Sequence, residues 1–99
     1  MTSSRNYLDF VLDRLSDVDD VTYRLMMGEY ILYFKGKVIG GIYDDRFLVK
    51  PTKSAKRLMP EAAYETPYTG AKDMLLVDNV DDSDFLRELP EALYADLTA

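Results

Sequence analysis

Apolar residues near the start of the chain repeat with the spacing of a helix. Four of them fall at positions i, i+3, i+4 and i+7: Leu8, Val11, Leu12 and Leu15. This spacing places them on one side of a helix over about residues 4–15. Ser3 or Ser4 can cap the start of this helix, and the turn-forming sequence SDVDD follows its end.

The segment that follows shows the pattern of short strands. Runs rich in aromatic and β-branched residues cover four ranges: about 21–27, 30–34, 38–43 and 46–50. Gly28, the turn Lys35–Gly36–Lys37 and the pair Asp44–Asp45 separate these runs. Because connections this short join antiparallel neighbours, the pattern predicts an antiparallel meander.

Beyond the meander, a helix and a strand are expected. Pro51 ends the meander, and Thr52 can cap a short helix that runs to Leu58. The continuous apolar run at residues 74–77 predicts a strand that is buried on both faces.

The last segment predicts a helix with an interruption. Asp81 or Ser83 starts it. Acidic residues lie in its first turn, where the helix dipole stabilises negative charge. Pro90 lacks an N–H group and collides with the carbonyl four residues earlier. We therefore expect a break near Glu88–Leu89, with Pro90 opening a second short helix.

These elements follow the order α-β-β-β-β-α-β-α, in one domain over residues 1–99. The order fits an α+β fold: a two-layer sandwich with about five antiparallel strands and its helices on one face. Gly40–Gly41 inside the third expected strand predicts a bulge or a helix packed tightly over bare backbone, with close approach of a ligand as the alternative.

The composition excludes several kinds of catalytic and metal-binding site. The chain has no Cys and no His, which excludes disulfides, thiolate nucleophiles, Cys/His zinc sites and His-containing triads. No phosphate-binding glycine loop and no calcium-loop spacing occurs, so we expect no cofactor and no metal. No apolar run is long enough to span a membrane, and the N-terminus does not resemble a secretory signal, so cytoplasmic residence is expected.

Charge is distributed unevenly along the chain. The net charge is −6, yet residues 35–57 hold seven basic and two acidic residues, a net +5, which leaves −11 elsewhere. Lys53, Lys56 and Arg57 share one face of the short helix, and Lys50 lies just before it. These four residues are either a docking patch for nucleic acid or another anion, or a solvated helix face.

Arg24 lies in an apolar strand. A buried cation requires a partner, so the sequence predicts a structural ion pair with Asp44, Asp45 or Glu29. Ligand binding by Arg24 is the alternative.

Short motifs along nearly the whole chain also carry a family resemblance. The segment from Arg24 through Met26 to Gly28 resembles the R-x-M-[FM]-G motif of the TfoX N-terminal domain family (Sxy-type competence regulators). The similar pattern continues at further positions of the chain: Gly40, Gly41, Asp45 and Pro51. The resemblance implies a five-stranded sandwich like that of type III secretion chaperones. In two-domain members, it implies a coactivator of competence genes that acts with a cyclic-AMP receptor protein.

The expected function is therefore that of a non-catalytic protein-interaction module and an accessory factor in transcription or competence regulation. Its partner is another protein, which docks on an exposed sheet face or edge strand. A homodimer is compatible with a chaperone-like sheet. Direct nucleic-acid or anion binding by residues 50–57 is the second hypothesis, and a small carboxylate-dependent enzyme is the third.

Overall fold

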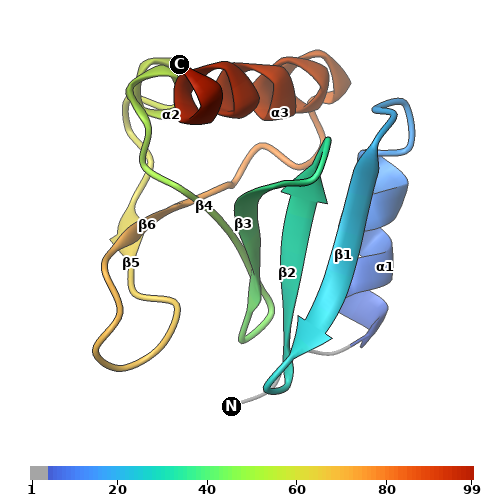
Figure 1. The fold of residues 1–99 in the computed structure, drawn as a ribbon, viewed down its shortest axis with the longest axis vertical. Coiled ribbons are helices and arrows are strands. Elements are labelled where there is room, and N and C mark those ends of the chain that lie inside the picture. Colours follow the sequence, from blue (N-terminus) through green and yellow to red (C-terminus); the bar gives the residue numbers. More distant parts are fainter. Residues whose placement is uncertain (1–4) are drawn as a thin grey trace.

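A computed structural model describes residues 5–99 of the chain. Its elements, in chain order, are α1 (Arg5–Arg14), β1 (Val21–Met26), β2 (Glu29–Phe34), β3 (Lys37–Tyr43), β4 (Arg46–Val49), α2 (Lys53–Leu58), β5 (Tyr64–Glu65), β6 (Met74–Leu76) and α3 (Ser83–Thr98) (Figure 1). The predicted caps Ser3 and Ser4 lie outside the described residues. Within residues 5–99, no helix has both the length and the apolar composition to cross a membrane.

The strands form one sheet in the order β1-β2-β3-β4-β6-β5, and every neighbouring pair is antiparallel. The predicted α+β class and antiparallel meander are confirmed. The sheet has six strands where about five were expected. The additional strand is β5, whose two residues pair with Leu75 and Met74 of β6. A two-residue strand is too short to produce an alternating pattern, which is why the sequence did not reveal it.

Three tight turns connect the first four strands. Each has two central residues with positive φ: Met27 and Gly28 (54° and 84°), Lys35 and Gly36 (51° and 80°), Asp44 and Asp45 (52° and 56°). This type I′ geometry matches the twist of the flanking strands. Glycine adopts it without strain, whereas other residues adopt it rarely. Met27 and Lys35 are therefore both unusual turn residues, and Met27 is the apolar one.

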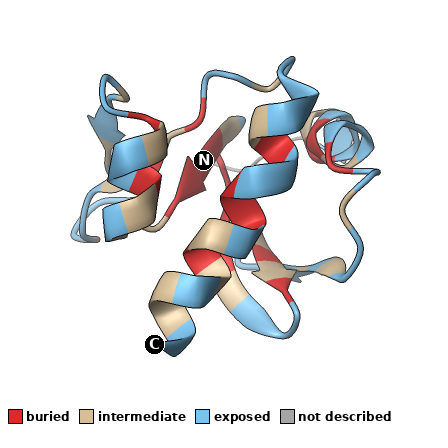
Figure 2. Cartoon of the chain, turned by 90° about the horizontal axis from the view of Figure 1, so that it is seen from above, coloured by how far each residue is buried: buried red, intermediate tan, exposed pale blue. Residues whose placement is uncertain are grey.

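One face of the sheet contains the core. Tyr30, Leu32 and Phe34 alternate along β2 and are buried, and they join one hydrophobic cluster with residues of α1 and α3. Leu8 of α1 and Leu93 of α3 belong to that cluster, and both are fully buried. Figure 2 shows the buried side of α3 as a red stripe along the helix. We call this side of the sheet the covered face.

Helix α3 is continuous from Ser83 to Thr98, so the predicted break before Pro90 is wrong. Leu86 and Leu89 precede the proline and Leu93 follows it, and all three leucines are buried with Pro90 against the core. Each buried leucine contributes about 1.5–3 kcal/mol, which offsets the roughly 3 kcal/mol cost of an internal proline.

Gly40 is required by close packing between strands. A Cβ atom there would overlap the backbone of Leu48 in β4. The ladder between β2 and β3 shifts register between Leu32 and Tyr33, which is the predicted irregularity. The element that packs closely against Gly40 is therefore strand β4, and not the helix that was also considered.

Candidate functional site

The second face of the sheet is covered only in part. Its residues include Arg24 and Met26 of β1 and Ile31 and Tyr33 of β2, which point away from the covered face because side chains alternate along a strand. We call this side the open face. Ile31 and Tyr33 are half-buried although both long helices pack on the other side.

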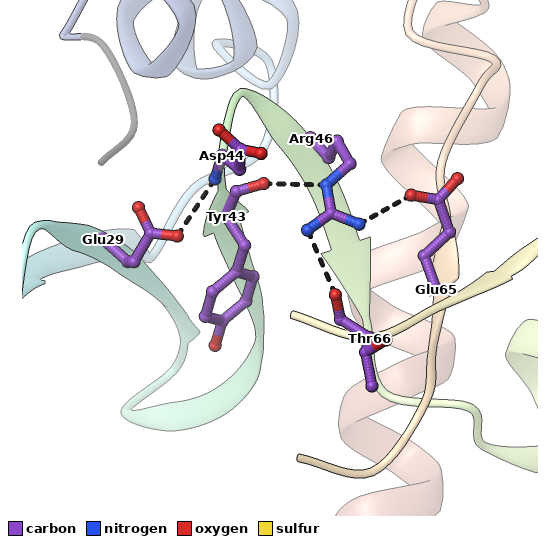
Figure 3. Close-up of polar contacts among 6 residues, drawn as sticks. All are labelled: Glu29, Tyr43, Asp44, Arg46, Glu65 and Thr66. Carbon is purple, nitrogen blue, oxygen red and sulfur yellow. Dashed lines mark hydrogen bonds and ion pairs between the residues drawn. The ribbon is translucent and has the colours of Figure 1, made fainter. Parts of the chain in front are cut away.

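The loop after β5 folds over the β4 end of the open face. Arg46 holds this loop in place (Figure 3). Its Nη1 lies 2.6 Å from Oε1 of Glu65, and its Nη2 donates to the carbonyl of Thr66 at 3.1 Å. Its Nε donates to the carbonyl of Tyr43 at 3.2 Å. Pro67, one residue further, is buried, so the loop is packed onto the sheet.

Between this loop and the first hairpin lies a groove of about 730 Å³, within the size range of ligand pockets. We call it the open-face groove. Its lining comes from the first hairpin, the β3–β4 turn region and the loop after β5: Met26, Met27, Glu29, Ile31, Tyr43, Asp44, Arg46, Thr66, Pro67, Tyr68 and Thr69. The sheet supplies the floor, and two segments distant in sequence supply the walls.

Tyr43 forms part of the floor because Gly41 has no side chain. A Cβ atom on Gly41 would lie 2.8 Å from the Tyr43 ring and 2.6 Å from the carbonyl oxygen of Tyr30. The Tyr43 ring centroid lies 6.4 Å from that of Tyr68 in the opposite wall. Burial, followed by the proximity of Tyr68 and Glu29, raises the pKa of Tyr43 above its usual 10.0. The phenol is therefore neutral at physiological pH.

The walls expose large apolar side chains. Met27 is 96% exposed, Tyr68 is 64% exposed and Met26 is 50% exposed. Met27 also occupies a turn position that favours Asn, Asp or Gly. Methionine side chains are flexible and polarisable, and they are frequent at surfaces that bind varied apolar partners. The turn therefore places an adaptable apolar side chain in solvent where folding alone favours a polar one.

One end of the groove is acidic. Oε2 of Glu29 accepts a hydrogen bond from the backbone N–H of Asp44 at 3.0 Å, which joins the first hairpin to the β3–β4 turn (Figure 3). Glu29 and Asp44 are the acidic residues of the lining, and Arg46, its basic residue, is paired with Glu65. Among the described residues, no group of three or more His, Cys, Asp or Glu side chains could hold a metal ion.

The predicted basic residues do gather, but away from the groove. Lys53, Lys56 and Arg57 are exposed on α2, and Lys50 is half-buried just before it. Asp96 of α3 lies beside them and accepts from the backbone N–H of Ser54 at 2.7 Å and from its hydroxyl at 3.0 Å. Hydrogen bonds from Ser54 and Thr52, with a smaller effect of Arg57, lower the pKa of Asp96.

The position of Arg24 contradicts the predicted structural ion pair. It is exposed, and its guanidinium carbon lies 5.9 Å from the centroid of the Tyr33 ring on the neighbouring strand. The described residues contain no ion pair between Arg24 and the three acids named for it. The side chain points to the open face, where water solvates the charge, so no buried partner is needed. Arg46 is the arginine that forms the structural ion pair.

The remaining motif positions lie in turns, after β4 and in the groove. Gly28 and Asp45 occupy tight turns with positive φ, Pro51 follows β4, and Met26 lines the groove. Sequence reasoning missed Met27 and Tyr68 as groove residues. The available signal was a Met–Gly pair at a hairpin turn, where Asn–Gly is the usual choice.

Comparison with known proteins identifies an uncharacterized relative of the chain. No family model and no solved structure matches the chain. The relative is the uncharacterized 12.7 kDa protein in the trpE 5' region of Spirochaeta aurantia, which is 36% identical over 80 residues. The match spans 81% of this chain and 70% of that protein. The chain therefore belongs to the same family as this Spirochaeta aurantia protein.

Proposed function

We propose that the protein is a non-catalytic interaction module that binds apolar side chains of a partner protein in the open-face groove. The exposed turn residue Met27 carries this proposal, because it is 96% exposed and adopts a backbone conformation with φ 54°. Asn or Asp would form this turn with less strain and less exposed apolar surface. Selection for a bound partner explains the methionine.

The lining of the groove and the composition of the chain support binding over catalysis. The groove combines an apolar hairpin wall, an aromatic wall at Tyr68 and an acidic end at Glu29 and Asp44. This combination suits an apolar segment that carries a basic residue. The absence of His and Cys from the sequence removes thiolate nucleophiles and the commonest general base.

The resemblance to the TfoX N-terminal domain family extends the proposal to a cellular role. We propose that the partner belongs to the transcription machinery and that the module acts in the cytoplasm as an accessory factor. In that role, the protein affects gene expression through its partner and not through contact with DNA. Its net charge of −6 supports this choice, since an acidic protein repels a phosphate backbone.

The test compares three immobilised proteins in extract of the source cells: the wild type, Met27→Asn and Lys35→Asn. Both substitutions change the first residue of a type I′ turn, but Lys35 does not line the groove. We expect a partner protein that is retained by the wild type and Lys35→Asn and lost by Met27→Asn. Mass spectrometry identifies it.

Two outcomes contradict the proposal. One is retention of the same proteins by all three columns. The other is recovery of nucleic acid without protein, together with a salt-dependent gel shift that disappears when Lys50, Lys53, Lys56 and Arg57 are reversed in charge. That second result assigns the function to α2 and its flanking lysine.

A further inference from the structure

Within residues 5–99, no strand pairs with the outer edge of the sheet at β1. The backbone N–H of Lys35 donates to the carbonyl of Asp20 at 3.0 Å, which makes these two residues a hydrogen-bonded pair in line with the β1–β2 register. Such pairs recur at every second residue of an antiparallel ladder. The N–H and C=O groups of the intervening residues therefore point outward: Val21, Tyr23 and Leu25.

This edge lacks the features that usually prevent strands from pairing. It is six residues long, its register with β2 is regular, and it contains no proline and no lysine. Natural edge strands are usually shorter, bulged, proline-containing or lysine-rich. The opposite edge, β5, has only two residues. The β1 edge is thus the better template for an added strand.

An apolar hollow adjoins the same edge. It has a volume of about 430 Å³ and lies between the C-terminal part of α1 and β1. Its apolar lining is formed by Leu12, Leu15, Val18, Val21 and Tyr23. We call it the edge hollow. Val21 and Tyr23 belong to the covered face, so a strand paired with β1 would direct alternate side chains into this hollow.

Acidic residues mark one end of the edge. Asp17, Asp19 and Asp20 immediately precede β1, and all three are exposed. The cross-strand neighbour of Asp20 is Lys35, whose Nζ lies 3.7 Å from Oε1 of Glu91. In an antiparallel pairing, the C-terminal end of an added strand lies at this end of β1. Lysine or arginine at that end of the strand would complement the charge.

We propose that the β1 edge binds an extended segment of a partner polypeptide as a seventh, antiparallel strand. Apolar residues at alternate positions of the segment enter the edge hollow, and basic residues at its C-terminal end lie against Asp17, Asp19 and Asp20. Main-chain hydrogen bonds supply affinity, and the hollow supplies specificity. This site is separate from the open-face groove and does not depend on it.

A lone segment fits this edge better than a second copy of the chain. Figure 1 shows α1 behind β1 at the outer side of the sheet. A second copy paired through its own β1 would bring its own α1 to the same side of the seam, where the two helices would compete for one space. A single extended strand carries no such helix.

The probe is a synthetic peptide, acetyl-Thr-Val-Thr-Val-Thr-Val-Lys-Lys, with binding measured by titration calorimetry on the full chain. Because the outward groups of β1 belong to covered-face residues, the valines are the residues whose N–H groups pair with β1. N-methylation of two valines should weaken binding at least about tenfold. N-methylation of two threonines should change it less than about twofold, because those N–H groups face solvent.

Protein variants test the hollow and the acidic end. Val18→Asp should abolish binding, whereas Val38→Asp, which replaces another half-buried valine outside the hollow, should not. Replacing Asp17, Asp19 and Asp20 by Asn should weaken binding several-fold at low salt and little at high salt. Asn tolerates the positive φ of Asp20. The matched control replaces Asp81, Asp82 and Asp84 by Asn.

Three results would overturn the inference: no binding of the unmodified peptide, equal effects of methylation on valines and threonines, or binding that survives Val18→Asp. Peptide binding by Met27→Asn should equal that of the wild type. A failure at the β1 edge is thereby separated from a failure of the open-face groove.

Discussion

Alternate residues of strand β2 meet two different environments. Tyr30, Leu32 and Phe34 are buried beneath two helices, whereas Ile31 and Tyr33 on the other side are half-buried without a helix over them. Both sets are apolar or aromatic. An antiparallel sheet with one solvated face normally alternates apolar and polar residues.

The excess of apolar residues on the open face is the informative difference. On the covered face, folding alone accounts for the apolar residues, because they form the core. The open face carries Ile31 and the exposed methionines Met26 and Met27, which folding alone does not explain. The difference separates residues that maintain the fold from residues that are available to a partner.

The largest contrast is expected between neighbouring positions of β2. Leu32→Ala removes a fully buried core side chain and should lower the free energy of unfolding by about 2–5 kcal/mol. Ile31→Ala should cost about 1 kcal/mol or less, because that side chain is only half-buried. Urea denaturation measures both. Equal losses would mean that the two faces do not differ in stability.

Gly41 tests whether the floor of the groove depends on close packing. Gly41→Ala places a Cβ atom 2.8 Å from the Tyr43 ring and 2.6 Å from a backbone oxygen, so we expect a loss of about 1–3 kcal/mol. Part of this loss should disappear in a Tyr43→Ala background, where the ring is absent. Strict additivity of the two substitutions in denaturation experiments would refute the ring contact.

Met27→Asn should stabilise the protein while it impairs partner binding. Asn fits the positive φ of the turn better than Met, so the free energy of unfolding should rise by about 0.5–1 kcal/mol. Lys35→Asn should have a similar or smaller effect, since it also loses an exposed ion pair with Glu91. Thermal unfolding compares the two. A destabilised Met27→Asn would show that the methionine serves the fold.

The smallest expected effect is a loss of stability at alkaline pH. The pKa of Tyr43 is raised in the folded state, mainly by burial. The folded state therefore holds this proton more tightly, and stability should fall as pH rises from the unfolded pKa near 10 through the folded value. Tyr43→Phe should reduce this alkaline loss, measured by denaturation across that pH range. An unchanged alkaline dependence would mean that Tyr43 is not buried in solution.

The sequence predicted the fold better than the site. Residues close together in sequence define α1 and the first hairpins, so periodicity and turn residues were sufficient. The continuity of α3 depended on leucines on both sides of Pro90 meeting a distant core. No local pattern contains that information.

The groove was hidden for a related reason. Its walls, at Met27 and Tyr68, come from separate segments that only the folded sheet brings together. Arg46 likewise finds its acid nineteen positions later in β5, an element too short to predict. The Met–Gly turn was visible in the sequence, but its meaning depended on knowing that the adjacent sheet face is open.

The most direct test of the open face uses a photo-crosslinking amino acid at position 27 or at position 35, in protein added to extract of the source cells. The two positions are matched, since each is the first central residue of a type I′ turn. One polypeptide should crosslink at position 27 and not at position 35, and Tyr68→Ser should remove the product. Crosslinks that are equal at both positions, or that persist without Tyr68, would contradict this expectation.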